Sequence, residues 1–225
     1  MKFDFFASLA NARGSLLSGF LYTLGSAFCS IIIGTLLGLV IGFALTYGSK
    51  GTKLPFRLFV DIIRGIPGLV VIFAVFYMVD YLLQIAFGIQ LSPFTAGVIS
   101  LSVFCSAQMA EITRGALQSI HKGQIEAGKA IGLRFYQVFF DIVLPQALVQ
   151  MVPPWVNSAT EIVKGTTLLT LIGVTELLLT AQQLVGVHGH ALLYYSMMGL
   201  VFFAMNYGIE SLGKVLERKL AFIKS

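Results

Sequence analysis

The sequence predicts an all-α integral membrane protein with about five transmembrane helices. Of its 225 residues 57% are hydrophobic and 11% are charged, which is more apolar surface than a soluble core of this size can bury. Uncharged runs cover residues 14–49, 81–110, 142–160 and 177–209, and a membrane-spanning helix needs about 20 apolar residues. These runs are long and do not alternate between polar and apolar residues, so they indicate helices and exclude barrel strands.

The elements are expected in a simple order within one transmembrane domain, residues 1–225. Residues 1–15 mix acidic, basic and small polar residues with three phenylalanines, which is typical of an interfacial helix leading into the first span. Spans placed near residues 16–47, 56–83, 93–118, 142–172 and 190–213 leave only short connections between them.

The charged residues of the connections predict the orientation, because basic residues mark the cytoplasmic side of a membrane. The second connection has no charge, and the fourth has only Glu176. We therefore expect the N-terminus outside, the C-terminus in the cytoplasm, and the first and third connections in the cytoplasm. The basic side of the chain holds Lys50, Lys53, Arg57, His121, Lys122, Lys129, Arg134, Lys214, Arg218, Lys219 and Lys224.

The third connection, residues 119–141, is the largest cytoplasmic feature. Its helix-forming residues and lack of internal proline predict one short helix on the membrane surface. Gly128 and Gly132 share a face at a spacing of four, where another surface can approach closely, while Glu126 projects from a different face. This shape is suited to docking into a cleft, and it lacks the apolar stripe and strongly basic face of a helix that only binds lipid.

The same region resembles the cytoplasmic loop of bacterial ABC importer permeases. Glu126, Ala127, Gly132, Ile142, Leu144 and Pro145 match the spacing E-A-A-x3-G-x9-I-x-L-P, with Gly128 in place of the second alanine. The stretches DIIRGIP (61–67), LSPFTAGVISLS (91–102), AEITRGALQSIHKGQIEAG (110–128) and LPQAL (144–148) are similar to the polar amino acid branch, which takes up histidine, glutamine and arginine.

The resemblance implies a type I ABC importer permease fold in the bacterial inner membrane. It implies a second permease chain, as homodimer or heterodimer, a dimer of ATPase subunits in the cytoplasm and an external substrate-binding protein. The helix over 123–137 would be the coupling helix seated on the ATPase. The coupling residues would be Glu126, Ala127, Gly128 and Gly132, with Glu126 as the polar contact and Gly132 as the turn toward the next span.

The chain has no phosphate-binding loop of the G-x4-G-K-[ST] type, so it is not expected to bind ATP or to be an enzyme itself. By the resemblance, ATP and Mg²⁺ bind the partner ATPase, and this chain needs no cofactor. No nucleophile with an adjacent base can be assembled from the spans. His188 and His190 lack a third ligand nearby, so no metal site is expected.

Ionisable residues inside spans are costly and must face a partner or a cavity. Asp61 and Arg64 are three residues apart, and so are Glu161 and Lys164, so each acid can pair with its own base or face a substrate. We expect Glu161 to accept the ammonium group of an amino acid and Lys164 or nearby hydroxyls to bind its carboxylate. The full set of predicted translocation residues is Glu161, Lys164, Thr166, Thr167, Asp61 and Arg64.

The stretch NSATEIVKGTTL is similar to the pattern N-E-x5-K-D-[TS]-[TS]-L of the polar amino acid permeases. Ser158 and Gly165 replace the two acids of that pattern, which leaves the identity of the substrate open and weakens the case for selectivity for basic amino acids. Pro153 and Pro154 are expected to interrupt the span before it, and the glycines and threonines of GTTLLTLIG to loosen the helix after it.

Two further patterns predict packing. Glu111 and Arg114 are expected to pair at the inner end of the third span, and Gly34, Gly38 and Gly42 form a small-residue face on the first span.

An alternative function is a self-contained secondary transporter or channel. Such proteins commonly contain internal repeats, which this short chain lacks.

Overall fold

The computed structural model describes residues 5–221, and all regular structure in that range is helical. Five helical segments are long and apolar enough to cross a membrane, which confirms the predicted fold class. They cover Asn11–Tyr47, Gly68–Phe87, Pro93–Gln118, Phe135–Ile172 and Ala191–Leu220. The elements are α1 (Phe5–Tyr47), α2 (Lys50–Gly65), α3 (Gly68–Phe73), the π-helical turn η1 (Ala74–Val79), α4 (Asp80–Phe87), α5 (Pro93–Gln118), α6 (Lys122–Ala130), α7 (Phe135–Gln137), the π-helical turn η2 (Val138–Val143), α8 (Leu144–Gly165), the 3₁₀ helix η3 (Thr166–Ile172), α9 (Leu177–His188) and α10 (Ala191–Ala221).

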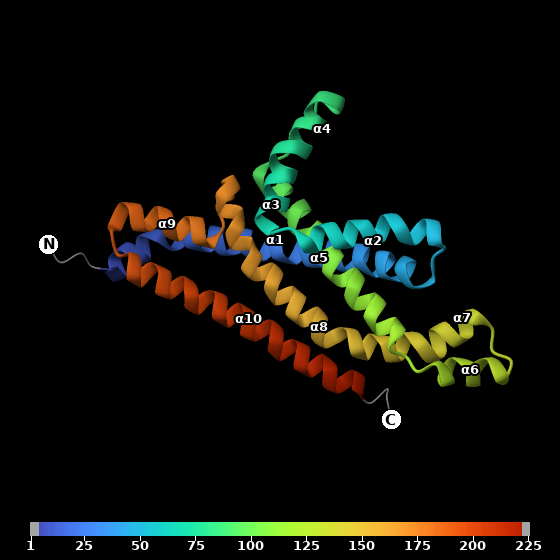
Figure 1. The fold of residues 1–225 in the computed structure, drawn as a ribbon. Coiled ribbons are helices and arrows are strands. Elements are labelled where there is room, and N and C mark those ends of the chain that lie inside the picture. The colour runs from blue at the N-terminus through green and yellow to red at the C-terminus, as the bar shows by residue number, and fades with distance from the viewer. Residues whose placement is uncertain (1–4, 222–225) are drawn as a thin grey trace.

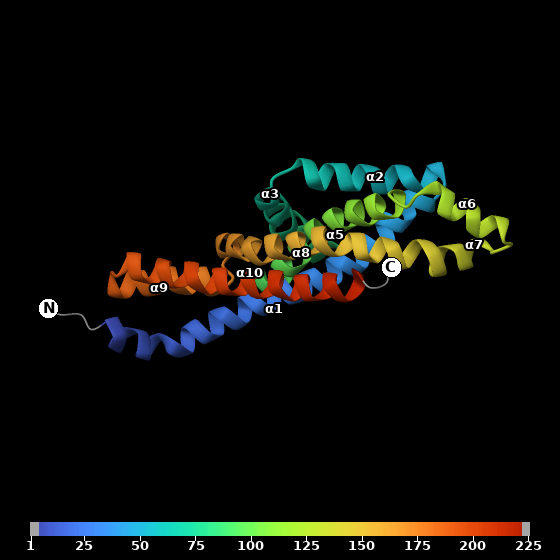
Figure 2. The same ribbon diagram turned by 90° about the horizontal axis from the view of Figure 1, so that it is seen from below.

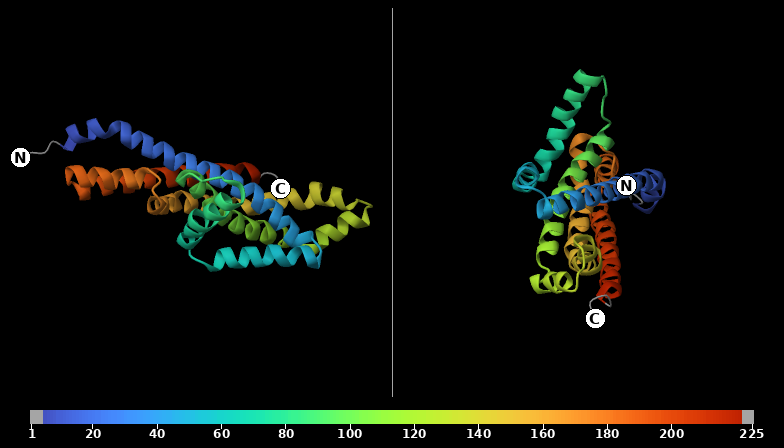
Figure 3. Two further views of the ribbon diagram at one scale, coloured as in Figure 1. Left: turned by 90° about the horizontal axis from the view of Figure 1, so that it is seen from above. Right: turned by 90° about the vertical axis from the view of Figure 1, so that its right-hand side faces the viewer.

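The molecule is elongated along α1 and α10 (Figures 1 and 2). One end contains the start of α1, the helix α9 and the start of α10, and the opposite end contains the α1–α2 connection together with α6 and α7 (Figure 1). Residues 5–15 belong to α1 without a break, whereas residues 1–4 of the predicted interfacial helix lie outside the described range. The α3–α4 segment projects away from the body of the molecule (Figure 3).

Helices α1 and α5 pack closely against each other. A Cβ atom added to Gly34, Gly38 or Gly42 would lie 2.4–2.5 Å from the Cβ of Cys105, Met109 or Thr113, respectively. The two helix backbones can therefore approach only because these glycines lack side chains. The predicted small-residue packing face is confirmed.

The second predicted span, residues 56–83, is not one helix. Ile66 is extended, with φ −109° and ψ 148°, and Pro67 begins the next segment. Proline lacks a backbone N–H and disfavours helical geometry in the residue before it, which explains the break. As a result α2 is a separate helix packed against α1 and α5, and the spanning segment begins at Gly68.

The interruption predicted at Pro153 and Pro154 is wrong, because α8 continues through both prolines to Gly165. Prolines are tolerated in membrane helices where neighbouring groups satisfy the freed carbonyls. The α-helix gives way at GTTLLTLIG, but η3 is a tighter 3₁₀ helix and not the loosened helix that was predicted; it ends at Gly173 with φ +83°.

The start of α9 is fixed by a buried carboxylate. Glu176 is fully buried and accepts hydrogen bonds from the backbone N–H groups of Leu178 and Leu179 at 2.9 and 2.8 Å and from the Thr170 hydroxyl at 2.6 Å. The Leu177 N–H donates to Thr23 Oγ1 of α1 at 3.1 Å. These bonds attach α9 and η3 to the first half of α1.

Candidate functional site

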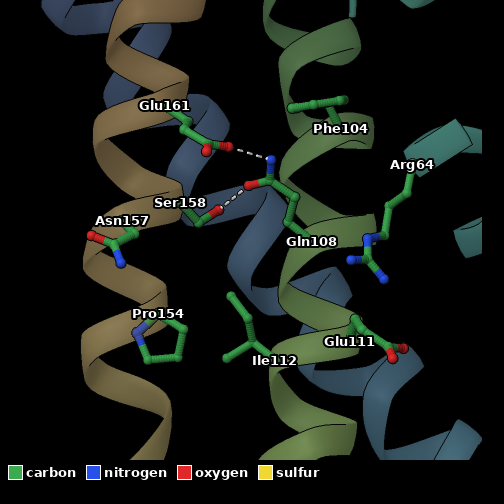
Figure 4. Close-up of a pocket in the computed structure, with 9 residues that line it drawn as sticks. All are labelled: Arg64, Phe104, Gln108, Glu111, Ile112, Pro154, Asn157, Ser158 and Glu161. Carbon is green, nitrogen blue, oxygen red and sulfur yellow. Dashed lines mark hydrogen bonds between the residues drawn. The ribbon is translucent and has the colours of Figure 1, made fainter. Parts of the chain in front are cut away.

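A polar cavity of about 480 Å³ lies between α5, α8 and the end of α2. Figure 4 shows α8 on one side and α5 on the other, with Arg64 beyond α5, on the same side as Glu111. Most of its polar atoms come from the middle of two spans, where a polar group must face a partner or a cavity. The lining residues are Arg64, Phe104, Gln108, Glu111, Ile112, Pro154, Asn157, Ser158 and Glu161.

Three side chains form a hydrogen-bonded chain across the cavity. The Ser158 hydroxyl donates to Gln108 Oε1, and Gln108 Nε2 donates to Glu161 Oε2 at 2.7 Å (Figure 4). Because Ser158 occupies the amide oxygen, the amide NH₂ is directed to the Glu161 carboxylate. Glu161 is exposed to the cavity, and only its Oε2 takes part in this chain of bonds.

A second polar network joins α2 to α5. The Glu111 carboxylate is bound by the guanidinium of Arg114, with Nε donating to Oε2 at 3.0 Å and Nη2 contacting Oε1. Arg57 donates to Asp61 Oδ2 at 3.0 Å and contacts Glu111 Oε2 at 3.3 Å. The pairing predicted for Glu111 and Arg114 is confirmed, and Arg57 extends it to α2.

The two other acid–base pairs considered from the sequence are not formed among the described ion pairs. Asp61 binds Arg57 rather than Arg64, because residues four apart on α2 face each other more directly here. Glu161 binds Gln108 rather than Lys164. Arg64 therefore lines the cavity, whereas Asp61 and Lys164 are exposed and do not.

The two predicted threonines also lie outside the cavity lining. Thr166 is fully buried, and its hydroxyl donates to the Val163 carbonyl at 2.7 Å. The Thr167 hydroxyl donates to the Lys164 carbonyl at 2.7 Å. Both hydroxyls thus satisfy the backbone where α8 changes into η3, and of the six predicted translocation residues the structure brings together only Glu161 and Arg64.

The cavity includes a residue that the sequence reasoning missed, Gln108. A neutral amide in an apolar run gives no charge signal, and its role depends on α5 facing α8. Its spacing of three from Glu111 was the available signal, since both side chains then lie on one face of the third span.

The predicted coupling helix is shorter than residues 123–137. Helix α6 ends at Ala130, and Gly132 follows with φ +87°, a left-handed conformation that glycine adopts without strain. The chain then turns through Leu133 and Arg134 into α7. Gly132 is therefore not on a helix face shared with Gly128, and that part of the prediction is wrong.

The close approach expected at Gly128 is made by the chain itself. Gly128 is buried, and a Cβ added there would lie 2.8 Å from Ile142 Cδ1 and 3.2 Å from Val138 Cγ2. Gln146 Nε2 also donates to Gln124 Oε1 at 2.6 Å. One side of α6 is thereby joined to η2 and α8, while Glu126 and Ala127 are exposed on another side.

Comparison with known proteins identifies this architecture. Residues 34–222 match the family described as the inner membrane component of binding-protein-dependent transport systems. The chain belongs to this family. It is accordingly a multi-pass membrane subunit of an ABC importer, and the family's permease subunits are not themselves catalytic.

The permease relatives match nearly the whole chain. The probable glutamine ABC transporter permease protein GlnP of Bacillus subtilis is 37% identical over 210 residues, covering 90% of this chain and 92% of the relative. The glutamine transport system permease protein GlnP of Escherichia coli strain K12 is 33% identical over 224 residues, covering 99% and 100%. The arginine ABC transporter permease protein ArtQ of Haemophilus influenzae is 33% identical over 188 residues, covering 82% of this chain and 84% of the relative.

Solved permease structures share the fold. A crystal structure of an amino acid ABC transporter with histidines matches with a TM-score of 0.85 at 27% identity, covering 97% of this chain and 100% of that one. An inward-facing MetNI methionine ABC transporter matches with a TM-score of 0.77 at 22% identity, covering 92% and 96%. The predicted ABC importer permease fold is confirmed, and it favours the ATP-driven permease over a self-contained secondary transporter.

Proposed function

We propose that this chain is the transmembrane permease subunit of an ATP-driven importer that carries a polar amino acid across the bacterial inner membrane. A separate pair of ATPase subunits binds ATP and Mg²⁺, a second permease chain completes the translocation path, and an external binding protein delivers the substrate. The relatives named for glutamine, arginine and cystine transport support the substrate class.

The observation that carries the mechanism is the double role of α6. Its exposed side, with Glu126 and Ala127, is available for docking to the ATPase. Its buried side packs on η2, which continues into α8. A displacement of α6 is thereby transmitted to α8, and α8 carries Ser158 and Glu161 into the cavity. Rigid transmission of this kind converts a local push into a rearrangement of the path.

Of the coupling residues, Glu126 and Ala127 form the ATPase contact. Gly128 and Gly132 instead shape α6 itself. Gly128 allows α6 to pack closely on η2, and Gly132 allows the chain to turn where α6 ends. All four serve coupling, in two different ways.

The amino acid occupies this cavity while it crosses the membrane. A zwitterion needs an acceptor for its ammonium group and a donor for its carboxylate. Glu161 supplies the first and Arg64 the second, while Asn157 adds an amide. Arg64 takes the role that the sequence suggested for Lys164, because Lys164, Thr166, Thr167 and Asp61 do not line the cavity.

The basic end of the molecule supports the orientation expected from the sequence. Lys50, Lys122 and Lys129 lie in or beside the α1–α2 connection and α6, at the end opposite to α9 (Figure 1). Basic residues favour the cytoplasmic side, so α6 faces the ATPase in the cytoplasm and the N-terminus is outside. Residues 1–225 form one transmembrane domain.

The experiment measures ATP hydrolysis and amino acid uptake by the assembled complex in proteoliposomes. Glu126→Arg reverses the charge on the exposed side of α6 and is expected to abolish uptake without changing ligand capture by the binding protein. Glu217→Arg makes the same charge change near the end of α10 and is the control. Unchanged uptake with Glu126→Arg, or uptake by the lone chain without ATP, would refute the proposal.

A further inference from the structure

We infer that the groove between α1 and α10 is a phospholipid site, in which Arg13 binds the phosphate and an acyl chain fills the apolar part of the groove. This groove is separate from the polar cavity between α5 and α8. The inference goes beyond the proposed function, because it concerns a lipid bound to the permease and not the cargo that the permease carries.

The groove lies between two long helices that begin at the same end of the molecule (Figure 1). Its volume is about 680 Å³, and its walls include Leu16 and Phe20 of α1 and Met198 and Val201 of α10. Leu177, the first residue of α9, also lines it. Helix α10 packs mainly on α8 and α9, so direct packing of α10 on α1 does not close this space.

The lining of the groove has the chemistry of a site for hydrocarbon. Arg13 is charged, and the other described residues of the lining are apolar. Ala204 is exposed, so the groove is open to the surroundings of the protein. An open apolar space in a bilayer is filled by lipid chains, because water finds no polar partners there and an empty space forfeits dispersion contacts. Three of the lining residues are methionines, whose flexible side chains adapt to a mobile chain.

Arg13 provides a partner for a phosphate at the right depth. It is exposed and forms no ion pair with another described residue. From residue 13 to residue 47 α1 is about 51 Å long at 1.5 Å per residue, whereas a bilayer with its headgroups is about 40–45 Å thick. With Tyr47 at the cytoplasmic surface, an ordinary tilt of α1 places Arg13 among the outer headgroups. A guanidinium there can bind a phosphate through two parallel hydrogen bonds.

The groove continues inward far enough to hold an acyl chain. Leu24 of α1 and Ile209 of α10 follow Phe20 and Met205 by about one turn, and they line a second apolar cavity of about 490 Å³. From residue 13 to residue 28 the stretch of α1 beside the two cavities is about 22 Å long. Half of the hydrocarbon core is about 15 Å thick. A chain whose phosphate is bound at Arg13 can therefore reach the bilayer midplane within the groove.

A second permease chain is the other occupant to consider, and the position of the groove argues against it. Ala159 and Val163 of α8 line the inward part of the groove, whereas Ser158 and Glu161 line the polar cavity. At 3.6 residues per turn these two pairs lie on nearly opposite sides of α8. A second chain that completes the translocation path contacts the cavity side, so the groove faces lipid.

The test is a titration of the purified permease–ATPase complex with phosphatidylglycerol, followed by native mass spectrometry. We expect at least one bound phospholipid for each permease chain. Arg13→Glu replaces the guanidinium by a group that repels phosphate, and we expect it to weaken the affinity roughly tenfold or more, the equivalent of one charge-assisted hydrogen bond. Arg218→Glu makes the same change at an exposed position of α10 outside the groove lining and should have little effect.

A second pair of variants tests the apolar part of the site. Ala204→Trp places a large side chain in the open part of the groove. It is expected to weaken the affinity roughly tenfold or more, because it displaces several methylene groups of the chain. Leu200→Trp introduces the same side chain at an exposed position of α10 outside the groove lining and should have little effect. ATP hydrolysis in the same samples identifies assembled complexes.

An unchanged affinity in assembled Arg13→Glu or Ala204→Trp complexes would overturn the inference, and so would the retention of detergent only. A crosslink between the two permease chains at Ala204→Cys, with Cys29 and Cys105 replaced by alanine, would show that a second chain fills the groove and would also overturn it. Each of these results leaves the proposed function standing, which is refuted only by uptake that does not need ATP or that tolerates Glu126→Arg.

Discussion

The two faces of α5 show contrasting kinds of packing. Toward α1 the contact is close, because glycines at 34, 38 and 42 allow the backbones to approach. Toward α8 the same helix lines a polar cavity, and Gln108 reaches across it to Ser158 and Glu161. Helix α5 thus forms one side of a close-packed interface and one side of a polar cavity.

The difference teaches which parts of the molecule are suited to move. Close packing has few alternative arrangements, because any shift forfeits many contacts or creates a clash. A cavity bounded by hydrogen bonds can rearrange by exchanging partners. We therefore expect α1 and α5 to move as one body and α8 to shift relative to them.

The largest expected effect is that of Gly38→Leu, which tests the close packing of α1 against α5. Its Cβ would lie 2.5 Å from Met109 Cβ and 2.8 Å from the Ser106 carbonyl oxygen, so the α1–α5 contact must separate. We expect a loss of about 3 kcal/mol or more in the free energy of unfolding, seen as reduced membrane yield and a lower thermal midpoint. Gly14→Leu on the same helix has open space around its Cβ and should have little effect. Equal effects of the two variants would show that the close packing is unimportant.

The polar edge of α5 is tested by Arg114→Gln. The guanidinium of Arg114 binds both oxygens of Glu111, and their side chains are only 26% and 21% exposed. Removing it leaves a half-buried carboxylate with the longer contact from Arg57, and we expect a loss of about 2 kcal/mol in stability of the purified complex. Arg57→Gln removes a more exposed partner and should cost under about 1 kcal/mol. The reverse order of effects would contradict the network described here.

A third test sharpens the distinction between structural and cavity carboxylates. Glu176, unlike Glu161, is fully buried and has both oxygens occupied. Replacing it by alanine removes the cap of α9 and should cost about 1 to 2 kcal/mol in thermal stability. The same change at Glu161 should affect substrate binding more than stability.

Glu176 also predicts a dependence on pH. Burial raises the pKa of Glu176, although its hydrogen bonds from Leu178, Thr170 and Leu179 oppose this effect. The unfolded chain then loses this proton at a lower pH than the folded chain. The stabilisation is therefore present below the unfolded pKa, about 4.3, and is lost as pH rises through the folded pKa. Glu176→Gln should remove this contribution from a series of thermal melts, and an unchanged pH profile would argue against it.

The smallest expected effect concerns a hydrogen bond between α8 and α1. The indole N–H of Trp155 on α8 donates to Thr35 Oγ1 on α1 at 2.9 Å. Trp155→Phe retains most of the apolar volume and loses this bond, so we expect a loss of about 1 kcal/mol in stability. Thr35→Val should have a similar effect, and the double variant should cost less than the sum of the two. Additive losses would mean that the bond contributes nothing.

Much of the fold could be predicted from the sequence because membrane spans have strong local signals. Apolar length identified five spans, and the spacing of Gly34, Gly38 and Gly42 identified a packing face. The break at Pro67 also had a local signal, but the predicted span 56–83 was drawn across it, so the separate α2 was missed.

The site was less predictable because it depends on which helices face one another. The spacing of three left open whether Glu161 pairs with Lys164 or faces a substrate, and its hydrogen-bond partner is Gln108 of another helix. Gly128 was correctly expected to allow a close approach, but the approaching surface is the chain's own η2. Partners from distant parts of the chain have no signature in local spacing.

The central claim is that movement of α6 by the ATPase changes access to the cavity through α8. The most direct measurement is the labelling rate of Asn157→Cys by a membrane-impermeant thiol reagent, in a complex whose Cys29 and Cys105 are replaced by alanine. The account predicts that trapping the ATPase with ATP and Mg²⁺ changes this rate, and that Glu126→Arg abolishes the change. An identical rate in both nucleotide states, with hydrolysis intact, would contradict it.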